Sequence, residues 1–183
     1  MEILIEKALA GDKDAYVKLI DSIKSDLYRV AQARLTNIDD VNDAIHETIL
    51  KSFKNLKRLK TTSYFKTWIT KILINECNNI YKTNNKQFWI FNKISNSKTN
   101  HISENTLQDI EDNFDFELML KNLNYDERIV IILYFNNRFS TYEIADILNI
   151  SANTVKSRLT RAKEKIKKSC KGGMKLWWIK III

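Results

Sequence analysis

The sequence predicts an all-α protein with two small helical domains joined by a flexible linker, the C-terminal domain containing a helix-turn-helix. Proline is absent and only 3 glycines occur in 183 residues, so little interrupts a helix. Apolar residues also recur at helical spacing over long stretches. An Asn- and Ser-rich stretch separates two such blocks. We therefore expect a domain at 1–83, a linker at 84–113, a domain at 114–171 and an apolar tail of unknown role at 172–183.

Three amphipathic helices are expected in the N-terminal block. The first covers residues 3–10 and stops near Gly11, and the second covers residues 15–35. The buried stripe of this second helix is expected to consist of Leu19, Ile23, Leu27, Val30 and Ala31. A third helix begins after Asn37, and its expected buried stripe consists of Val41, Ala44, Ile45, Ile49 and Phe53.

The buried stripe of the third helix leaves three acids on its other faces, Asp40, Asp43 and Glu47, here called the acidic ridge. A ridge of this kind is either simply solvated or docks a basic helix of a partner. The sequence alone leaves both interpretations open.

The charge then reverses, because residues 48–75 contain no acid. The aromatic residues Tyr64, Phe65 and Trp68 lie among the cations of this stretch. Cations that follow a phosphate backbone beside rings on which bases stack are what single-stranded nucleic acid requires. Phe65 shares helical spacing with three isoleucines, so we expect it in the core, while Tyr64 and Trp68 either contact bases or pack. The cations are Lys51, Lys54, Lys57, Arg58, Lys60, Lys66 and Lys71.

The predicted linker has an aromatic first half and an acidic second half. Phe88–Phe91 either packs on a domain or serves as a docking anchor. The acidic half is either a solvated tether or a segment that occupies a basic channel on a partner. The acids of this run are Glu104, Asp109, Glu111 and Asp112, and it continues past the linker with Asp115 and Glu117.

The C-terminal block predicts a helix-turn-helix at residues 140–168. Its first helix, 141–148, has an apolar stripe of Ile144, Ala145 and Leu148, and a turn follows at 149–151. Ser151 is a suitable N-cap for the second helix because its hydroxyl accepts from an unpaired amide of the first turn. The core side of the second helix is expected to be Val155, Leu159, Ala162 and Ile166.

The opposite side of this second helix is polar and basic. From Lys156 to Lys171 there are eight basic residues and one acid, a net charge of +7. Short polar side chains and an arginine can reach base edges, and flanking cations suit phosphates. The alternative is a surface helix of a bundle. The outward residues are Asn153, Ser157, Thr160 and Arg161, flanked by Thr154, Lys156 and Arg158.

Composition favours a polyanionic partner and disfavours metal or redox chemistry. The formal net charge is +8, which suits nucleic acid without identifying it. Cys77 and Cys170 have no CxxC spacing, and His46 and His101 form no ligand pattern with them, so we expect no metal and no cofactor. The N-terminus shows no basic region followed by an apolar run, and we expect a reducing, cytoplasmic location.

Four motifs in order resemble the extracytoplasmic-function (ECF) class of bacterial RNA polymerase sigma factors. They are residues 39–48 (DDVNDAIHET), residues 65–69 (FKTWI) with Asn75, residues 142–145 (YEIA) and residues 154–162 (TVKSRLTRA). The chain departs from the usual pattern at His46, where the class has Gln, at Ile49, where it has an aromatic residue, and at Asn124, where it has Pro. The missing proline should soften the start of a helix at residues 125–128.

The resemblance implies a role for each part of the N-terminal block. The helix at 39–53 would dock on the clamp helices of the largest polymerase subunit through the acidic ridge. The loop at 57–63 and the helix at 64–81 would melt the −10 promoter element and hold a flipped base. The residues implied for this are Lys57, Arg58, Lys60, Tyr64, Lys66, Trp68, Lys71 and Asn75.

The resemblance also implies that residues 115–171 read the −35 element as duplex and that the linker follows the RNA exit path. The implied contacts are Ser151, Asn153, Thr154, Lys156, Ser157, Arg158, Thr160 and Arg161. The implied partners are core RNA polymerase, promoter DNA and an anti-sigma factor, with no small-molecule substrate and no catalysis.

A competing class is a polymerase-independent helix-turn-helix regulator whose N-terminal helices dimerise or sense a ligand. Such a protein would bind its site unaided and would not need the basic aromatic segment. The apolar tail is too short to span a bilayer, which takes about 20 residues; it would pack back, bind a partner or touch a membrane surface.

Overall fold

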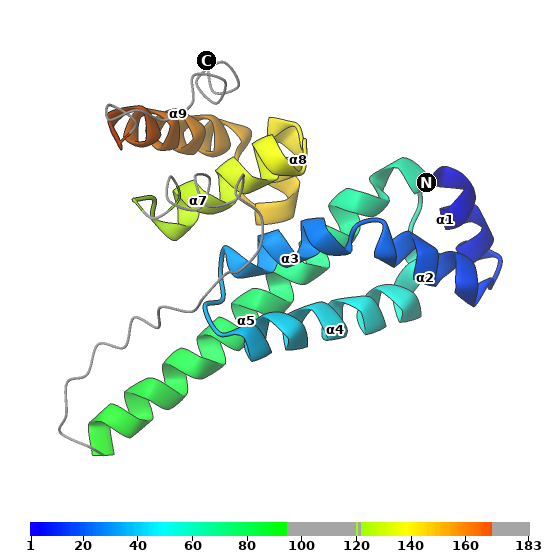
Figure 1. Cartoon of the computed structure of the whole chain (residues 1–183), viewed down its shortest axis with the longest axis horizontal. Coiled ribbons are helices and arrows are strands. Elements are labelled where there is room, and N and C mark those ends of the chain that lie inside the picture. The colour runs from blue at the N-terminus through cyan, green and yellow to red at the C-terminus, as the bar shows by residue number, and fades with distance from the viewer. Residues whose placement is uncertain (95–119, 121, 170–183) are drawn as a thin grey trace. The chain divides into compact units, whose positions relative to one another are not determined.

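The computed structural model describes residues 1–94, 120 and 122–169, and every regular element within them is helical (Figure 1). The chain divides into two compact units, residues 1–105 and 106–183. Two helical units confirm the predicted fold class. The predicted acidic half of the linker and the apolar tail lie outside the described residues, as do His101 and Cys170.

The described part of the N-terminal unit, residues 1–94, has five helices. Two short 3-10 turns, η1 (Leu56–Arg58) and η2 (Thr62–Tyr64), connect the last two. In the described residues of both units, no helix is both long and apolar enough to cross a membrane. The helices are α1 (Glu2–Leu9), α2 (Lys13–Asp21), α3 (Lys24–Gln32), α4 (Ile38–Asn55) and α5 (Phe65–Ile94).

Local capping sets several helix boundaries. Gly11, which follows α1, has a φ of +101°, a conformation that glycine adopts without the steric cost of a Cβ. Asp12 then begins α2 by accepting a hydrogen bond from the amide of Ala15 at 3.0 Å. Asn37 begins α4 by accepting from the amide of Asp39 at 2.8 Å, which confirms the predicted start of this helix.

The single helix predicted at 15–35 is wrong, because α2 and α3 are separate. The Ser22 hydroxyl donates to the carbonyl of Leu19 at 2.6 Å, and the Ile23 amide donates to Ile20 at 3.0 Å. These tighter local bonds compete with the continuation of an α-helix. The predicted apolar stripe is nevertheless confirmed, since all its members are buried: Leu19, Ile23, Leu27, Val30 and Ala31.

The predicted buried stripe of α4 is correct in its first half and wrong in its second. Ile49 is half-buried and Phe53 is 44% exposed, whereas Thr48 and Ser52 are fully buried. The Tyr16 hydroxyl explains the exchange, since it donates to the Ile49 carbonyl at 2.8 Å and is hydrogen-bonded to the Ser52 hydroxyl at 2.6 Å. Satisfied hydroxyls can be buried at little cost. The confirmed members are Val41, Ala44 and Ile45.

Helix α5 runs to Ile94, beyond the predicted helix end near Tyr81 and into the predicted linker. Asparagine lowers helix propensity only modestly, and the segment contains neither glycine nor proline, so the helix continues. Asn84 also ties this region to the start of α4 by donating to the Asp40 carboxylate at 2.8 Å. The side chains of residues 85–94, including the Phe88–Phe91 cluster, lie outside the described residues.

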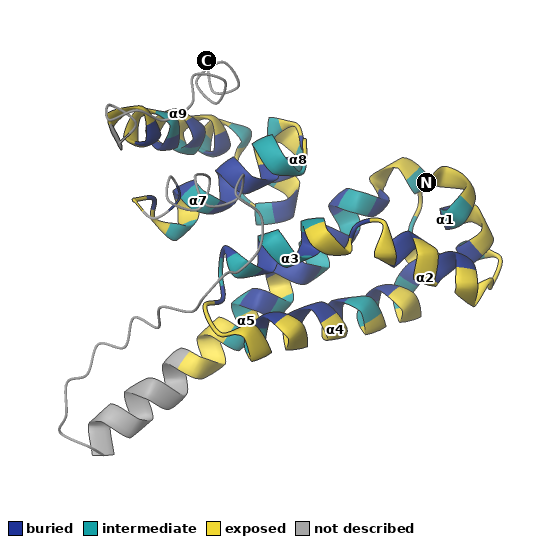
Figure 2. Cartoon of the chain, viewed as in Figure 1, coloured by how far each residue is buried: buried dark blue, intermediate teal, exposed yellow. Residues whose placement is uncertain are grey.

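Residues 122–169 of the C-terminal unit form α7 (Tyr125–Ile131), a short π-helical segment η3 (Ile132–Asn136), α8 (Thr141–Leu148) and α9 (Ala152–Ser169). Figure 2 shows the buried face of α9 turned toward the other helices of this unit. Its expected core residues are confirmed as buried: Val155, Leu159, Ala162 and Ile166.

Capping also defines the helices of the second unit. Asn124, where the ECF class has proline, forms a capping box with Glu127: its side chain accepts from the Glu127 amide at 2.9 Å, and its own amide donates to the Glu127 carboxylate. This cap offsets the loss of the proline. In α8 the residues buried deepest are Ile144 and Ile147, while Ala145 and Leu148 of the predicted stripe are half-buried.

The hydroxyl of Tyr16 should contribute measurably to folding. We expect Tyr16→Phe to lower the free energy of unfolding by about 1 to 2 kcal/mol, because Ser52 and the Ile49 carbonyl lose a buried partner. Urea unfolding followed by circular dichroism measures the change. Tyr64→Phe is the matched control, because Tyr64 is 60% exposed and its substitution should change stability by less than about 0.5 kcal/mol. Equal stability of wild type and Tyr16→Phe would contradict the assignment.

Candidate nucleic-acid interface

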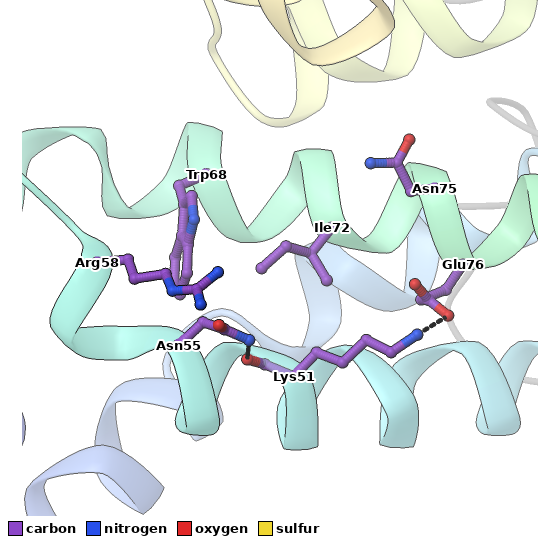
Figure 3. A pocket seen from close by; sticks show the side chains of 7 residues that line it. All are labelled: Lys51, Asn55, Arg58, Trp68, Ile72, Asn75 and Glu76. Carbon is purple, nitrogen blue, oxygen red and sulfur yellow. Dashed lines mark hydrogen bonds and ion pairs between the residues drawn. The ribbon is translucent and has the colours of Figure 1, made fainter.

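A groove of about 410 Å³ lies in the N-terminal unit between α4, η1 and α5 (Figure 3). Three of its lining residues, Arg58, Trp68 and Asn75, are among those implied for nucleic-acid binding. The structure therefore brings together residues from two distant parts of the acid-free stretch. The full lining is Lys51, Asn55, Arg58, Trp68, Ile72, Asn75 and Glu76.

The burial pattern of α5 places these side chains on the groove. Phe65, Ile69 and Leu73 are fully buried on one face of the helix. Trp68 and Ile72 each precede a buried residue by one position, so they lie beside that face. The ring of Trp68 packs against Phe65 with centroids 6.1 Å apart, and its side chain is half-buried at the end of the groove. The expected core role of Phe65 is confirmed.

Lys51 and Glu76 form the other end of the groove. The Lys51 Nζ lies 2.6 Å from the Glu76 carboxylate, whose side chain is 14% exposed. Asn55 donates to the main-chain carbonyl of Lys51 at 2.8 Å, one turn along α4. Sequence reasoning counted Lys51 only as one of several cations and missed Asn55, Ile72 and Glu76. A usable signal exists, since Glu76 is the first acid after the acid-free stretch.

The remaining residues implied for this region do not line the groove. Lys57, Lys60 and Tyr64 are exposed in the segment that follows α4. Lys66 and Lys71 are half-buried on α5. None of these five side chains belongs to the lining of the groove.

The acidic ridge lies on α4. Asp43 and Glu47 are exposed, while Asp40 is half-buried and accepts the hydrogen bond from Asn84. One turn after Glu47, the exposed side of α4 continues with Leu50 and Phe53, which are 51% and 44% exposed. The ridge therefore ends in two accessible apolar side chains.

The outer face of α9 carries the polar residues expected there. Asn153, Ser157, Thr160 and Arg161 are all exposed. Ser151 accepts from the amide of Thr154 at 3.0 Å, which confirms it as the N-cap. The turn before it includes Asn149 in the left-handed conformation with a φ of 53°. Exposed Lys156 and half-buried Thr154 flank this face.

Two ion pairs tie α9 to α7. Arg158, which the sequence places on the flank, donates to the Asp126 carboxylate at 2.8 Å and has a side chain only 20% exposed. Lys165 donates to the Glu127 carboxylate at 2.8 Å. Both cations belong to the basic helix, yet they hold it against its neighbour.

Glu127 is held charged although it is buried. Burial by itself raises the pKa of its carboxyl, but the hydrogen bonds from Lys165 and from the Asn124 amide, together with the charges of Lys165 and Arg161, lower the pKa below its ordinary value. The charged form of Glu127 thus stabilises both the start of α7 and its junction with α9.

Family models and known proteins match both units. The model described as Sigma-70 region 2 matches residues 19–87, and that of Sigma-70 region 4 matches residues 114–166. The chain is 23% identical to ECF RNA polymerase sigma factor SigW of Bacillus subtilis, covering 92% of this chain and 97% of the relative. It is 29% identical to RNA polymerase sigma factor SigV of the same organism, covering 82% and 87%.

Solved structures with a similar fold include two complexes. One is CnrH in complex with the cytosolic domain of CnrY, at a TM-score of 0.63 and 20% identity, covering 91% of this chain and 94% of that one. The other is the sigma factor RpoE in complex with the anti-sigma factor NepR from Bartonella quintana, at a TM-score of 0.68 and 23% identity, covering 86% and 97%.

The lowered pKa of Glu127 predicts a pH-dependent stability. A carboxyl with a lower pKa in the folded state stabilises the protein above its unfolded pKa, about 4.3, and this contribution is lost as pH falls through the folded pKa. We expect Glu127→Gln to lower the thermal midpoint near neutral pH, and the difference from wild type to shrink in strong acid. Thermal melts across this range measure it. Exposed Glu164→Gln is the control, and a pH-independent difference would contradict the argument.

Proposed function

Since the chain belongs to the ECF class of RNA polymerase sigma factors, we propose that its two units bind promoter DNA in different states while core polymerase sets their separation. One observation carries the proposal. A groove edged by cations and a tryptophan lies in the unit matched by region 2, and an outward basic helix of a helix-turn-helix lies in the unit matched by region 4.

The groove suits a single unstacked strand from the −10 element. Trp68 offers a ring at its end, Arg58 offers a cation beside that ring, and Asn75 offers a polar amide. Unstacking a base costs a few kcal/mol, which stacking and polar contacts must offset. Outside the groove, phosphate contacts are proposed for Lys57, Lys60, Lys66 and Lys71, and a stacking contact for Tyr64.

The outer face of α9 suits the major groove of the −35 element. We assign base-edge contacts to Asn153, Ser157, Thr160 and Arg161, and phosphate contacts to Lys156 and to Ser151 and Thr154 at the helix start. Arg158 can serve twice, because a guanidinium has five donors and its bond to Asp126 uses only part of them. We therefore keep Arg158 as a phosphate contact that also positions α9.

The acidic ridge suits docking on core polymerase. Exposed Asp43 and Glu47 provide the charge, and Leu50 and Phe53 provide accessible apolar surface beside it. Interfaces commonly combine an apolar centre with charged surroundings. Asp40 is assigned a smaller part, since Asn84 already engages its carboxylate.

The proposed setting follows from this function. As a factor that works on the polymerase, the chain would act in the cytoplasm as a DNA-binding subunit. This role needs no catalytic residue, cofactor or metal of its own. The two solved structures named above are complexes with a second protein, and in one of them that protein is named an anti-sigma factor. We propose an anti-sigma factor as a further partner of this chain.

Each unit alone should bind DNA weakly. Two modules linked by a long segment gain affinity from each other only when their separation fits both sites. Core polymerase would supply that separation and remove the cost of ordering the linker. The competing polymerase-independent regulator is not favoured, because both sigma region models match in order.

Run-off transcription with purified core polymerase tests the function. We expect the wild-type chain to direct initiation at specific sites on genomic templates, whereas core alone initiates without selection. The double variant Asp43→Lys and Glu47→Lys should lose association with core, measured by size-exclusion chromatography, and lose initiation with it, because like charges then face the basic partner.

The matched control is the double variant Glu6→Lys and Asp21→Lys, which changes the net charge equally at exposed positions of α1 and α2. It should retain both association and initiation. Wild type that adds no selectivity to core would overturn the function, and a charge-reversed ridge that still binds core would overturn only the docking assignment.

Arg161 should contribute to the reading of the −35 element. We expect Arg161→Ala to weaken holoenzyme binding to the preferred −35 sequence by about 1 to 3 kcal/mol and to reduce discrimination between sequences. Competition binding with single-base variants of the element measures both effects. Lys168→Ala, in the last turn of α9, is the control. An equal loss on every sequence would show that Arg161 contacts a phosphate.

A further inference from the structure

The groove of the N-terminal unit has two chemically different ends (Figure 3). Arg58 and Trp68 form a cationic and aromatic end, and the ion pair of Lys51 with Glu76 forms the other. Trp68 and Glu76 are eight residues apart on α5, which is about 12 Å along a helix that rises about 1.5 Å per residue. One nucleotide can therefore contact both ends.

Glu76 is unexpected in such a place. It is the single acid among the seven lining residues. A carboxylate in a groove for a polyanion lowers the affinity unless its charge is neutralised or it makes a favourable contact with the ligand. Lys51 offsets the charge by donating to Oε2 at 2.6 Å. Within the described part of the chain, no hydrogen bond reaches the other oxygen, Oε1, so one acceptor stays available at a fixed place in the groove.

We propose that Glu76 determines base specificity in this groove by accepting a hydrogen bond from the exocyclic amino group of cytosine or adenine. The inference rests on the proposed function, because it needs an unstacked promoter base in the groove. Lys51 is a positioning residue here, since it holds the Glu76 carboxylate and neutralises it without being required to touch the base.

The direction of the nucleotide follows from charge. A phosphate is attracted to Arg58, and the ring of the same nucleotide can lie along Trp68 and the apolar side chain of Ile72. The edge of the base farthest from the sugar then points toward Glu76. In cytosine and adenine this edge carries an amino group, N4 or N6, whereas in thymine and guanine it carries a carbonyl, O4 or O6.

A carboxylate distinguishes these two edges sharply. When ionised it only accepts hydrogen bonds, so at the exocyclic group it pairs with an amino group and is repelled by a carbonyl oxygen. The ring N–H next to the carbonyl in unpaired thymine or guanine lies one atom farther along the edge, so the discrimination depends on Oε1 facing the exocyclic group. The mismatched base would also cover the Glu76 carboxylate, whose side chain is already only 14% exposed, without giving its free oxygen a donor. The groove should therefore prefer an amino-bearing base at one position of the −10 element.

Transcription from a randomised template pool tests this inference. Holoenzyme made with the full chain transcribes a pool of promoters randomised across the −10 element, and sequencing of the initiated templates gives the preference at each position. We expect wild type to favour cytosine or adenine over thymine and guanine by about tenfold at one position. Glu76→Gln should reduce that ratio to below about twofold, because the glutamine amide can donate to a carbonyl as well as accept.

Glu6→Gln on α1 makes the same chemical change at an exposed position and should keep the wild-type ratio. If wild type selects promoters but Glu76→Gln keeps the full preference at every position, the inference is wrong and the proposed function stands. If wild type initiates on the pool without any sequence preference, both fail. Glu76→Gln keeps the side-chain size and an acceptor for Lys51, and its circular dichroism spectrum should match wild type.

Discussion

The packing of α4 along α5 is the constraint on which the N-terminal unit depends. Helix α5 contributes fully buried Phe65, Ile69 and Leu73, and α4 contributes a face that includes Ala44 and Thr48. Apart from Arg58 of η1, the residues that line the groove lie next to this core on the surfaces of α4 and α5. Groove residues and core residues thus lie on adjacent faces of the same two helices. A change in the packing of α4 against α5 would therefore move both ends of the groove at once.

Apolar spacing predicted much of the fold, and its failures have identifiable causes. The core side of α9 was predicted in full. A helix with an apolar stripe and a strongly basic face can pack in only one way, with the stripe toward the core and the basic face toward solvent. On α4, Thr48 and Ser52 displaced the expected Ile49 and Phe53, since Thr48 donates to the Ala44 carbonyl at 2.7 Å and Ser52 is satisfied through Tyr16. Spacing cannot show which hydroxyls will find partners from another helix.

The groove shows the same limit at the level of function. Residue type and the acid-free stretch indicated Arg58, Trp68 and Asn75, because cations and an aromatic ring are recognisable one by one. Lys51 and Glu76 are 25 positions apart, and their pairing depends on the register of α4 against α5. The amino-acid composition does not reveal that register. The sequence therefore marks Glu76 as the first acid after the acid-free stretch, but it does not show that Glu76 pairs with Lys51 in the groove.

The basic helix α9 uses its cations for two purposes that respond differently to salt. Lys165 pairs with a Glu127 side chain that is only 5% exposed, and Arg158 is itself mostly buried against Asp126. Exposed cations such as Lys156 face solvent, where ions screen them over about 10 Å at 0.1 M salt. Partly buried pairs are screened much less. Rising salt should therefore weaken the hold on phosphates while α9 stays seated on α7, so that affinity for DNA changes without loss of the surface that reads it.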